Sequence, residues 1–175
     1  FGASIRSVPP PAELSGPLFL GPLIYPKYPL FVLATGLLLF LLVRLLLART
    51  TFGVQVRAVT TDPGMASSLG IRPAQVSLTT FGLGSALAGF GGVVGAPLIA
   101  LAPGLDAQMT LFALIVVVIG GLGRIEGAFF GALLVGLVEG FGRLFFPQVA
   151  MFLIFALMAL VLALKPEGLL GRRGA

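Results

Sequence analysis

Long apolar runs constrain this chain more than any other feature of its sequence. Residues 30–47 contain one charged side chain, Arg44, and residues 74–100 contain none. A membrane-spanning helix needs about 20 predominantly apolar residues. Charged residues make up only 10% of the chain, whereas a soluble domain has about a quarter. We therefore expect lipid, not water, to surround most of the fold.

Charged and turn-forming residues divide the apolar sequence into five segments: 30–47, 74–100, 109–119, 128–146 and 149–164. The predicted fold class is all-α. We expect a polytopic membrane protein with about five transmembrane or part-membrane helices in one domain over residues 1–175. Residues 74–164 form its glycine-rich helical core.

Residues 1–29 are rich in proline, which prevents a continuous helix. They predict an extended loop on the outer membrane surface, with Tyr25 and Tyr28 as interfacial anchors. The chain starts at Phe1 without the pattern of a signal peptide, and we expect it to be a fragment or a processed chain.

The basic residues lie at the ends of the apolar runs, a distribution typical of membrane topology and not of nucleic-acid binding. With the 49–73 loop placed inside, the turns alternate between the two sides and the 165–175 tail is also inside. This orientation predicts a multi-pass protein of the bacterial inner or plasma membrane with a cytoplasmic C-terminus. The inner basic residues would be Arg57, Arg72, Arg124, Lys165, Arg172 and Arg173, and the outer ones Arg6, Lys27 and Arg143.

The sequence excludes several kinds of chemistry. It has no Cys and no His, which removes thiolate catalysis and the commonest metal ligands. Its two lysines do not follow glycines, so the Walker A phosphate cradle is absent and the chain is not itself an ATPase. The glycine-rich stretch 120–127 could imitate a nucleotide loop, but no strand–helix unit surrounds it, which favours a tight turn. We expect no cofactor.

The polar loop at residues 49–73 contains one local helix signature. Asp62 followed by Pro63 is typical of a helix start, and Gly70 is a suitable C-terminal cap. A short helix over residues 63–69 could dock another protein, or it could be part of an ordinary connection.

Glu139 and Arg143 are charges within the fourth apolar run. They are four residues apart, so they can pair on one helix face. Ionisable groups inside a span often face a wet cavity, which would make this pair part of a transport pathway or gate. The alternative is a structural ion pair near the outer interface.

Several glycines have the spacing of close helix packing, in which small residues let two backbones approach. The same residues could also allow one helix to shift against another. The set is Gly91, Gly95, Gly123, Gly127, Gly131, Gly136 and Gly140.

Three stretches carry a resemblance to a known family. They are RAVTTDPGMASSLGI at 57–71, VIGGLGRIEGAFFGALLVGLVE at 118–139 and KPEGLLG at 165–171. In this order they resemble the permeases of branched-chain amino acid ABC transporters, the LivH/LivM group, from about residue 52 to the end. Glu139 matches an acidic position that is often found in the family.

The resemblance implies a membrane subunit that works with cytoplasmic ABC ATPase subunits, a second permease subunit and an extracytoplasmic solute-binding protein. The 49–73 loop corresponds to the family's coupling motif E-A-A-x-x-x-G. Ala66 matches its second Ala and Gly70 its Gly, whereas Gly64 replaces the Glu and Met65 the first Ala. The implied ATPase-docking residues are Arg57, Ala58, Asp62, Ala66, Gly70 and Ile71.

The function expected from this resemblance is translocation of branched-chain amino acids by alternating access, driven by separate ATPases. Urea or short amides would suit the same architecture. A channel or ion-coupled carrier without an ATPase and a purely structural subunit are further alternatives.

Overall fold

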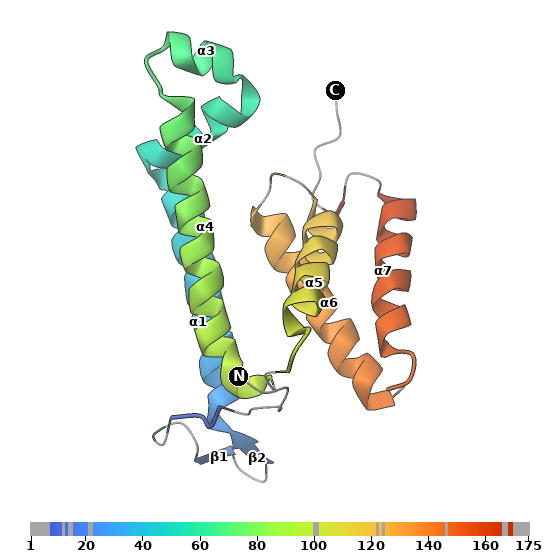
Figure 1. The fold of residues 1–175 in the computed structure, drawn as a ribbon. Coiled ribbons are helices and arrows are strands. Elements are labelled where there is room, and N and C mark those ends of the chain that lie inside the picture. Colours follow the sequence, from blue (N-terminus) through green and yellow to red (C-terminus); the bar gives the residue numbers. More distant parts are fainter. Residues whose placement is uncertain are drawn as a thin grey trace. The chain divides into compact units, whose positions relative to one another are not determined.

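The computed structural model describes residues 8–11, 13, 16–20, 23–99, 102–121, 123, 125–145, 147–165 and 168–169. The chain comprises two compact units, Phe1–Pro103 and Gly104–Ala175 (Figure 1). The all-α expectation is confirmed, and the described residues add one small hairpin. Arg6, Arg124, Arg172 and Arg173, on which the predicted orientation partly depends, lie outside the described residues.

The first unit begins with two short antiparallel strands where we expected only an extended loop. Strand β1 spans Pro17–Leu20 and β2 spans Leu23–Pro26. Pro17 pairs with Pro26 at the open end of this hairpin. Proline is tolerated at strand ends because the missing N–H does not interrupt a continuous ladder there.

Two long helices, α1 (Lys27–Arg49) and α4 (Pro73–Gly95), lie side by side in the first unit (Figure 1). The hydroxyl of Tyr28 at the start of α1 donates a 2.8 Å hydrogen bond to the carbonyl of Val94 at the end of α4, so the helices run antiparallel. Tyr28 is thus a buried tie between helices, in addition to any interfacial role. A short 3-10 turn, η2 (Ala96–Leu98), follows α4 at Pro97.

Between α1 and α4 the chain forms two helices where the sequence predicted one. Helix α2 spans Thr51–Thr61 and α3 spans Pro63–Ser68. The α3 prediction is confirmed in position and in its Asp62 start, whereas α2 was missed. Its β-branched residues have modest helix propensity, so its stability depends on contacts with α1.

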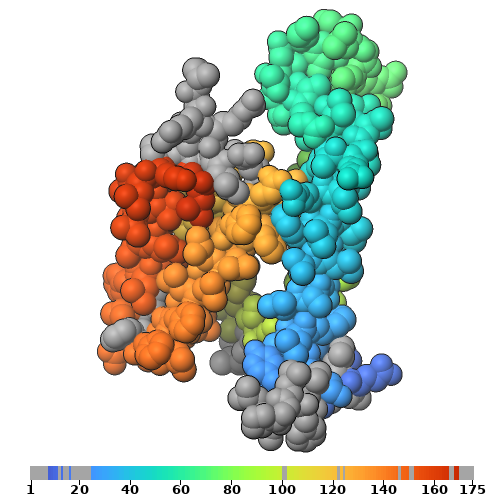
Figure 2. Space-filling view, turned by 180° about the vertical axis from the view of Figure 1, so that it is seen from behind, coloured from blue at the N-terminus to red at the C-terminus, as the bar shows by residue number. Residues whose placement is uncertain are grey.

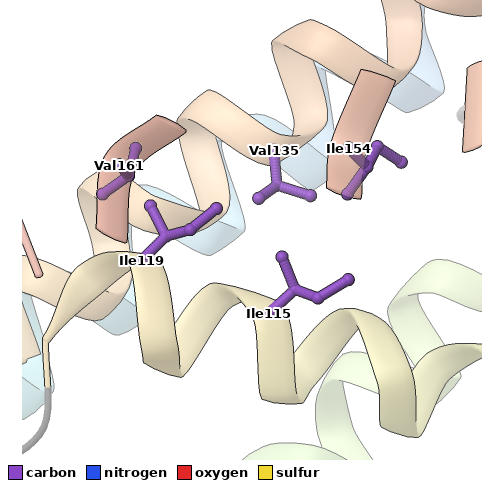
Figure 3. Packing of buried hydrophobic residues seen from close by; sticks show 5 residues of the cluster. All are labelled: Ile115, Ile119, Val135, Ile154 and Val161. Atoms are coloured by element: carbon purple, nitrogen blue, oxygen red, sulfur yellow. The ribbon is translucent and has the colours of Figure 1, made fainter. Parts of the chain in front are cut away.

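The described residues of the second unit form three helices, α5 (Leu105–Gly120), α6 (Ile125–Phe145) and α7 (Ala150–Leu164). Aliphatic side chains from all three meet in a buried cluster (Figure 3). Ile119 and Ile154 at its centre are almost completely buried. The cluster consists of Ile115, Ile119, Val135, Ile154 and Val161.

Helices α5 and α6 approach each other through backbone and not through side chains. A Cβ added to Gly127 would collide with the carbonyl oxygen of Gly120, and one added to Gly131 would lie 2.7 Å from the carbonyl oxygen of Val116. Gly123 instead occupies the α5–α6 turn with φ +87°. The 120–127 stretch thus runs from the last residue of α5 to the first turn of α6, as expected for a tight turn.

The other predicted packing glycines have open space around them in the part of the chain that the structure describes. An added Cβ would meet no atom within 4 Å at Gly91, Gly95, Gly136 or Gly140. The role of these four glycines in close helix packing therefore stays a prediction.

Gly168 and Leu169, which follow α7, contact the end of α5. The Leu169 N–H donates a 2.8 Å hydrogen bond to the carbonyl of Ile119. Gly168 has φ +84°, and an added Cβ there would lie 2.5 Å from the Cα of Gly121, so the position requires glycine. Within the predicted tail, Leu169 thus caps the C-terminal end of α5.

Within the residues that the structure describes, three helices are long and apolar enough to cross a membrane: α1, α4 extended to Leu98, and α6. Two shorter apolar helices accompany them, Leu105–Gly120 and Phe152–Leu164. These five correspond to the five predicted segments, with α5 and α7 as the short ones.

Gly127→Ala should destabilise the second unit by about 1–3 kcal/mol, because overpacking at a backbone contact forces α5 and α6 apart. Thermal unfolding of the protein purified in detergent measures the change. Gly136→Ala is the matched control, since its added methyl meets open space and alanine is the better helix former. Equal losses in the two variants would contradict the close crossing.

Candidate docking site between helices α1 and α4

The loop that carries the candidate docking residues is fastened to the end of α1. The Thr50 hydroxyl donates to the carbonyl of Leu46 at 2.5 Å and accepts from the Gly53 N–H at 3.4 Å. One threonine therefore closes α1 and caps α2, which satisfies backbone groups at both helix ends.

Gly53 allows α2 to cross α1 at backbone distance. A Cβ at this position would collide with the carbonyl oxygen of Leu47. The same carbonyl accepts a 2.5 Å hydrogen bond from the Arg57 guanidinium, one turn further along α2. A cation at the C-terminal end of a helix is also favoured by the helix dipole. Arg57, predicted for docking, thus holds α2 against α1.

Helix α3 is capped at both ends by residues that the sequence singled out. The Asp62 carboxylate accepts from the N–H groups of Gly64 and Met65 at 2.8 and 2.9 Å. At the other end Gly70 has φ +81°. Its N–H donates to Ser67 and the N–H of Ile71 to Ala66, at 3.0 and 3.1 Å. This is the double hydrogen-bond pattern of a Schellman cap.

The caps fix which face of α3 points outward. Ala66 is 2% exposed and belongs to the inner face, whereas Met65 and Leu69 are 65% and 72% exposed. Met65 and Leu69 are four residues apart and therefore share one side of the helical turn. The space-filling view shows α3 and its flanking turns as the teal-green end of the unit, beyond the cyan residues of α2 (Figure 2).

The six predicted docking residues thus have different environments. Ala66 is buried, and Ala58 and Ile71 are half-buried. Arg57, Asp62 and Gly70 are exposed and build the scaffold that presents α3. Sequence reasoning missed Met65 and Leu69, although an apolar pair spaced by four residues within a polar loop could have indicated them.

Glu139 and Arg143 form the expected ion pair on α6. Their side chains approach to 2.5 Å, with the glutamate 23% exposed and the arginine 65% exposed. Arg143 also lies in the last turn of α6, where a positive charge is favoured. The geometry fits both a structural pair and a charged lining of a pathway.

Among the described residues, no group of three acidic side chains gathers as metal ligands would. The loop presents a small helix on which Met65 and the adjoining Leu69 are exposed.

Comparison with protein families gives one match over most of the chain. The family model described as "Branched-chain amino acid transport system / permease component" matches residues 7–164. No solved structure is significantly similar to the chain.

Named relatives agree with this match. The permease protein BraD of a high-affinity branched-chain amino acid transport system, from Pseudomonas aeruginosa, is 36% identical over 144 residues, which are 81% of this chain and 45% of BraD. LivH from Escherichia coli K12 is 35% identical over 69% of this chain and 40% of its own length. A probable LivH from Methanocaldococcus jannaschii is 29% identical over 77% of this chain and 45% of its own length. The chain spans about half the length of these relatives.

Replacing the α3 cap should loosen that helix alone. Asp62→Ala removes the acceptor of two N–H groups and should cost about 1 kcal/mol of local stability. Hydrogen exchange of the backbone amides in residues 64–69 is expected to accelerate several-fold. Asp62→Asn keeps a capping oxygen and should retain most of the protection. Unchanged exchange in Asp62→Ala would show that the cap does not hold α3.

Proposed function

Because this chain belongs to the branched-chain amino acid transport permease family, we propose that it is the membrane subunit of an ATP-driven importer. Separate ATPase subunits would dock on α3. They would drive the translocation of branched-chain amino acids by alternating access. A second permease subunit and an extracytoplasmic solute-binding protein would complete the complex. The relatives' names support the solute class.

This proposal places the loop containing α2 and α3, and the C-terminal tail, in the cytoplasm. Three arginines, Arg49, Arg57 and Arg72, and one acidic residue, Asp62, support this side for the loop. An excess of positive charge in a short loop between spans favours the cytoplasm.

The observation that carries the proposal is the rigid presentation of an apolar pair outside the spans. Met65 and Leu69 are strongly exposed on a helix that is capped at both ends. A capped helix that presents apolar side chains four residues apart is suited to placing them in an apolar groove on a partner. Ala66 is buried, so its proposed role is to seat α3 and not to touch the ATPase.

The structure offers a physical reason for the departure at Gly64. A Cβ at this position would lie 3.3 Å from the Asp62 carboxylate oxygen. A glutamate here would bring a second negative charge next to the capping carboxylate. With Gly64, the partner would meet an uncharged outer face on α3, and its docking pocket is proposed to be mainly apolar.

Met65→Glu with Leu69→Glu should separate the ATPase from the membrane subunit, because two charges would have to enter the apolar pocket. We expect at least a tenfold fall in ATP-driven leucine uptake and loss of co-purified ATPase. Val54→Glu is the matched control, since Val54 is an exposed apolar residue of the same loop on α2. Full coupling in the double variant would refute docking through this face.

The second candidate is a channel or carrier that works without an ATPase and uses the Glu139–Arg143 pair. The partial burial of Glu139 favours this candidate.

The same uptake assay with urea and short amides as competitors separates the alternative solutes from branched-chain amino acids.

Glu139→Gln distinguishes the two functions. In an ATP-driven importer with a structural pair, uptake should fall by less than about fivefold and should still require the ATPase, because a partly exposed pair contributes at most about 1 kcal/mol. In an ion-coupled carrier, uptake should persist without the ATPase and collapse in Glu139→Gln. Proteoliposome uptake with and without ATP gives the answer.

A further inference from the structure

We propose that the pocket between α2 and the start of α4 binds the phosphate headgroup of an anionic phospholipid. The pocket has a volume of about 640 Å³ and lies entirely within the first unit. Its walls come from α2, the Gly70 turn and the first two turns of α4. The residues that line it include Phe52, Gln55, Arg72, Gln75, Val76 and Thr79.

One side of the pocket carries polar groups that are available to an anion. Arg72 supplies a guanidinium with five N–H donors, and Gln55 and Gln75 supply amide donors. The structure records no side-chain hydrogen bond or ion pair for these three residues within the described part of the chain. The pocket lining includes no acidic residue. Planar guanidinium donors match phosphate geometry well.

The other side of the pocket is apolar. Val76 is buried, and Phe52 and Ile71 are half-buried. A free inorganic anion would gain nothing from these side chains, whereas a phospholipid presents a glycerol and acyl chains directly below its phosphate. The pairing of cationic and apolar walls therefore favours a lipid over a soluble anion.

The depth of the pocket agrees with this ligand. A bilayer core of about 30 Å corresponds to about 20 helical residues. Counting about that number from Val94, which is tied to Tyr28 near the opposite interface, reaches Ala74 on α4. The same count from Tyr28 along α1 reaches Ala48, next to the end of that helix. Arg72 thus lies at headgroup level, and Thr79 lies below it at the level of the first acyl carbons.

This inference rests on the membrane position of α1 and α4 and not on the proposed docking of an ATPase. Leu69 borders the pocket and also belongs to the exposed face of α3. A bound lipid would therefore lie next to the docking face.

The test uses the absence of tryptophan from the chain. Phe52→Trp places one fluorophore in the pocket, and Phe90→Trp places another on an exposed position of α4 far along the helix. The full chain is reconstituted in vesicles of phosphatidylcholine and phosphatidylglycerol, with brominated acyl chains on one lipid at a time. Bromine quenches tryptophan only at close range, so the ratio of the two quenching curves gives the local lipid preference.

We expect about a fivefold preference for phosphatidylglycerol at the Phe52→Trp site, as one well-placed arginine provides, and nearly none at the Phe90→Trp site. Arg72→Gln in the same background should abolish the preference. Arg49→Gln is the matched control, because it removes the same charge from the same end of the unit but does not line the pocket. The Arg72 side chain makes no capping hydrogen bond, so this variant should fold.

Three results would overturn the proposal. Equal quenching by both lipids at the Phe52→Trp site would show that the pocket does not select anionic headgroups. Loss of the preference on adding inorganic phosphate at constant ionic strength would identify a soluble-anion site instead. An Arg72→Gln variant that keeps its lipid preference but no longer retains the ATPase would assign Arg72 to an acidic group of that partner.

Discussion

Backbone groups at helix ends must find partners wherever lipid excludes water, and this requirement organises the whole structure. The last carbonyls of α1 are satisfied by Thr50 and Arg57, both from the segment that follows. The carbonyl of Ile119 near the end of α5 is satisfied by Leu169, from the segment that follows α7. Helix α2 and Leu169 are therefore each held by hydrogen bonds to the end of a neighbouring helix.

Burial has a smaller role than in a water-soluble domain. The aliphatic cluster around Ile119 and Ile154 is small, and large side chains such as Leu33 and Phe81 are 70% and 75% exposed. In lipid this exposure has no hydrophobic cost, so helices associate through close backbone approach and hydrogen bonds instead. The glycine crossing of α5 and α6 provides that approach in the second unit, and the Tyr28–Val94 bond links the two long helices in the first.

Local chemistry made much of this fold predictable, and nonlocal contacts explain what was missed. Asp62, Pro63 and Gly70 encode the ends of α3 within a few residues, so the helix could be read from sequence. Helix α2 was missed, because Gly53 and Arg57 contact Leu47 on another helix and such contacts are not visible in the local sequence. The family motif located the docking loop, but motif positions do not state which face is exposed. Ala66 proved buried and Met65 exposed. Glycine spacing likewise indicates that a helix can pack closely, but it does not identify the helix against which it packs.

The backbone contact between Gly53 and Leu47 has a mechanical consequence. At most helix crossings, side chains lie between the two backbones and can change their torsion angles when the helices shift. Main-chain atoms in direct contact cannot adjust in this way, so they transmit a displacement almost unchanged. Helix α2 has 11 residues and is therefore a stiff arm of about 16 Å, with α3 at its far end and the crossing at its near end. If a partner displaced α3, α2 would rotate about the contact between Gly53 and Leu47. The end of α1 would then move together with α2.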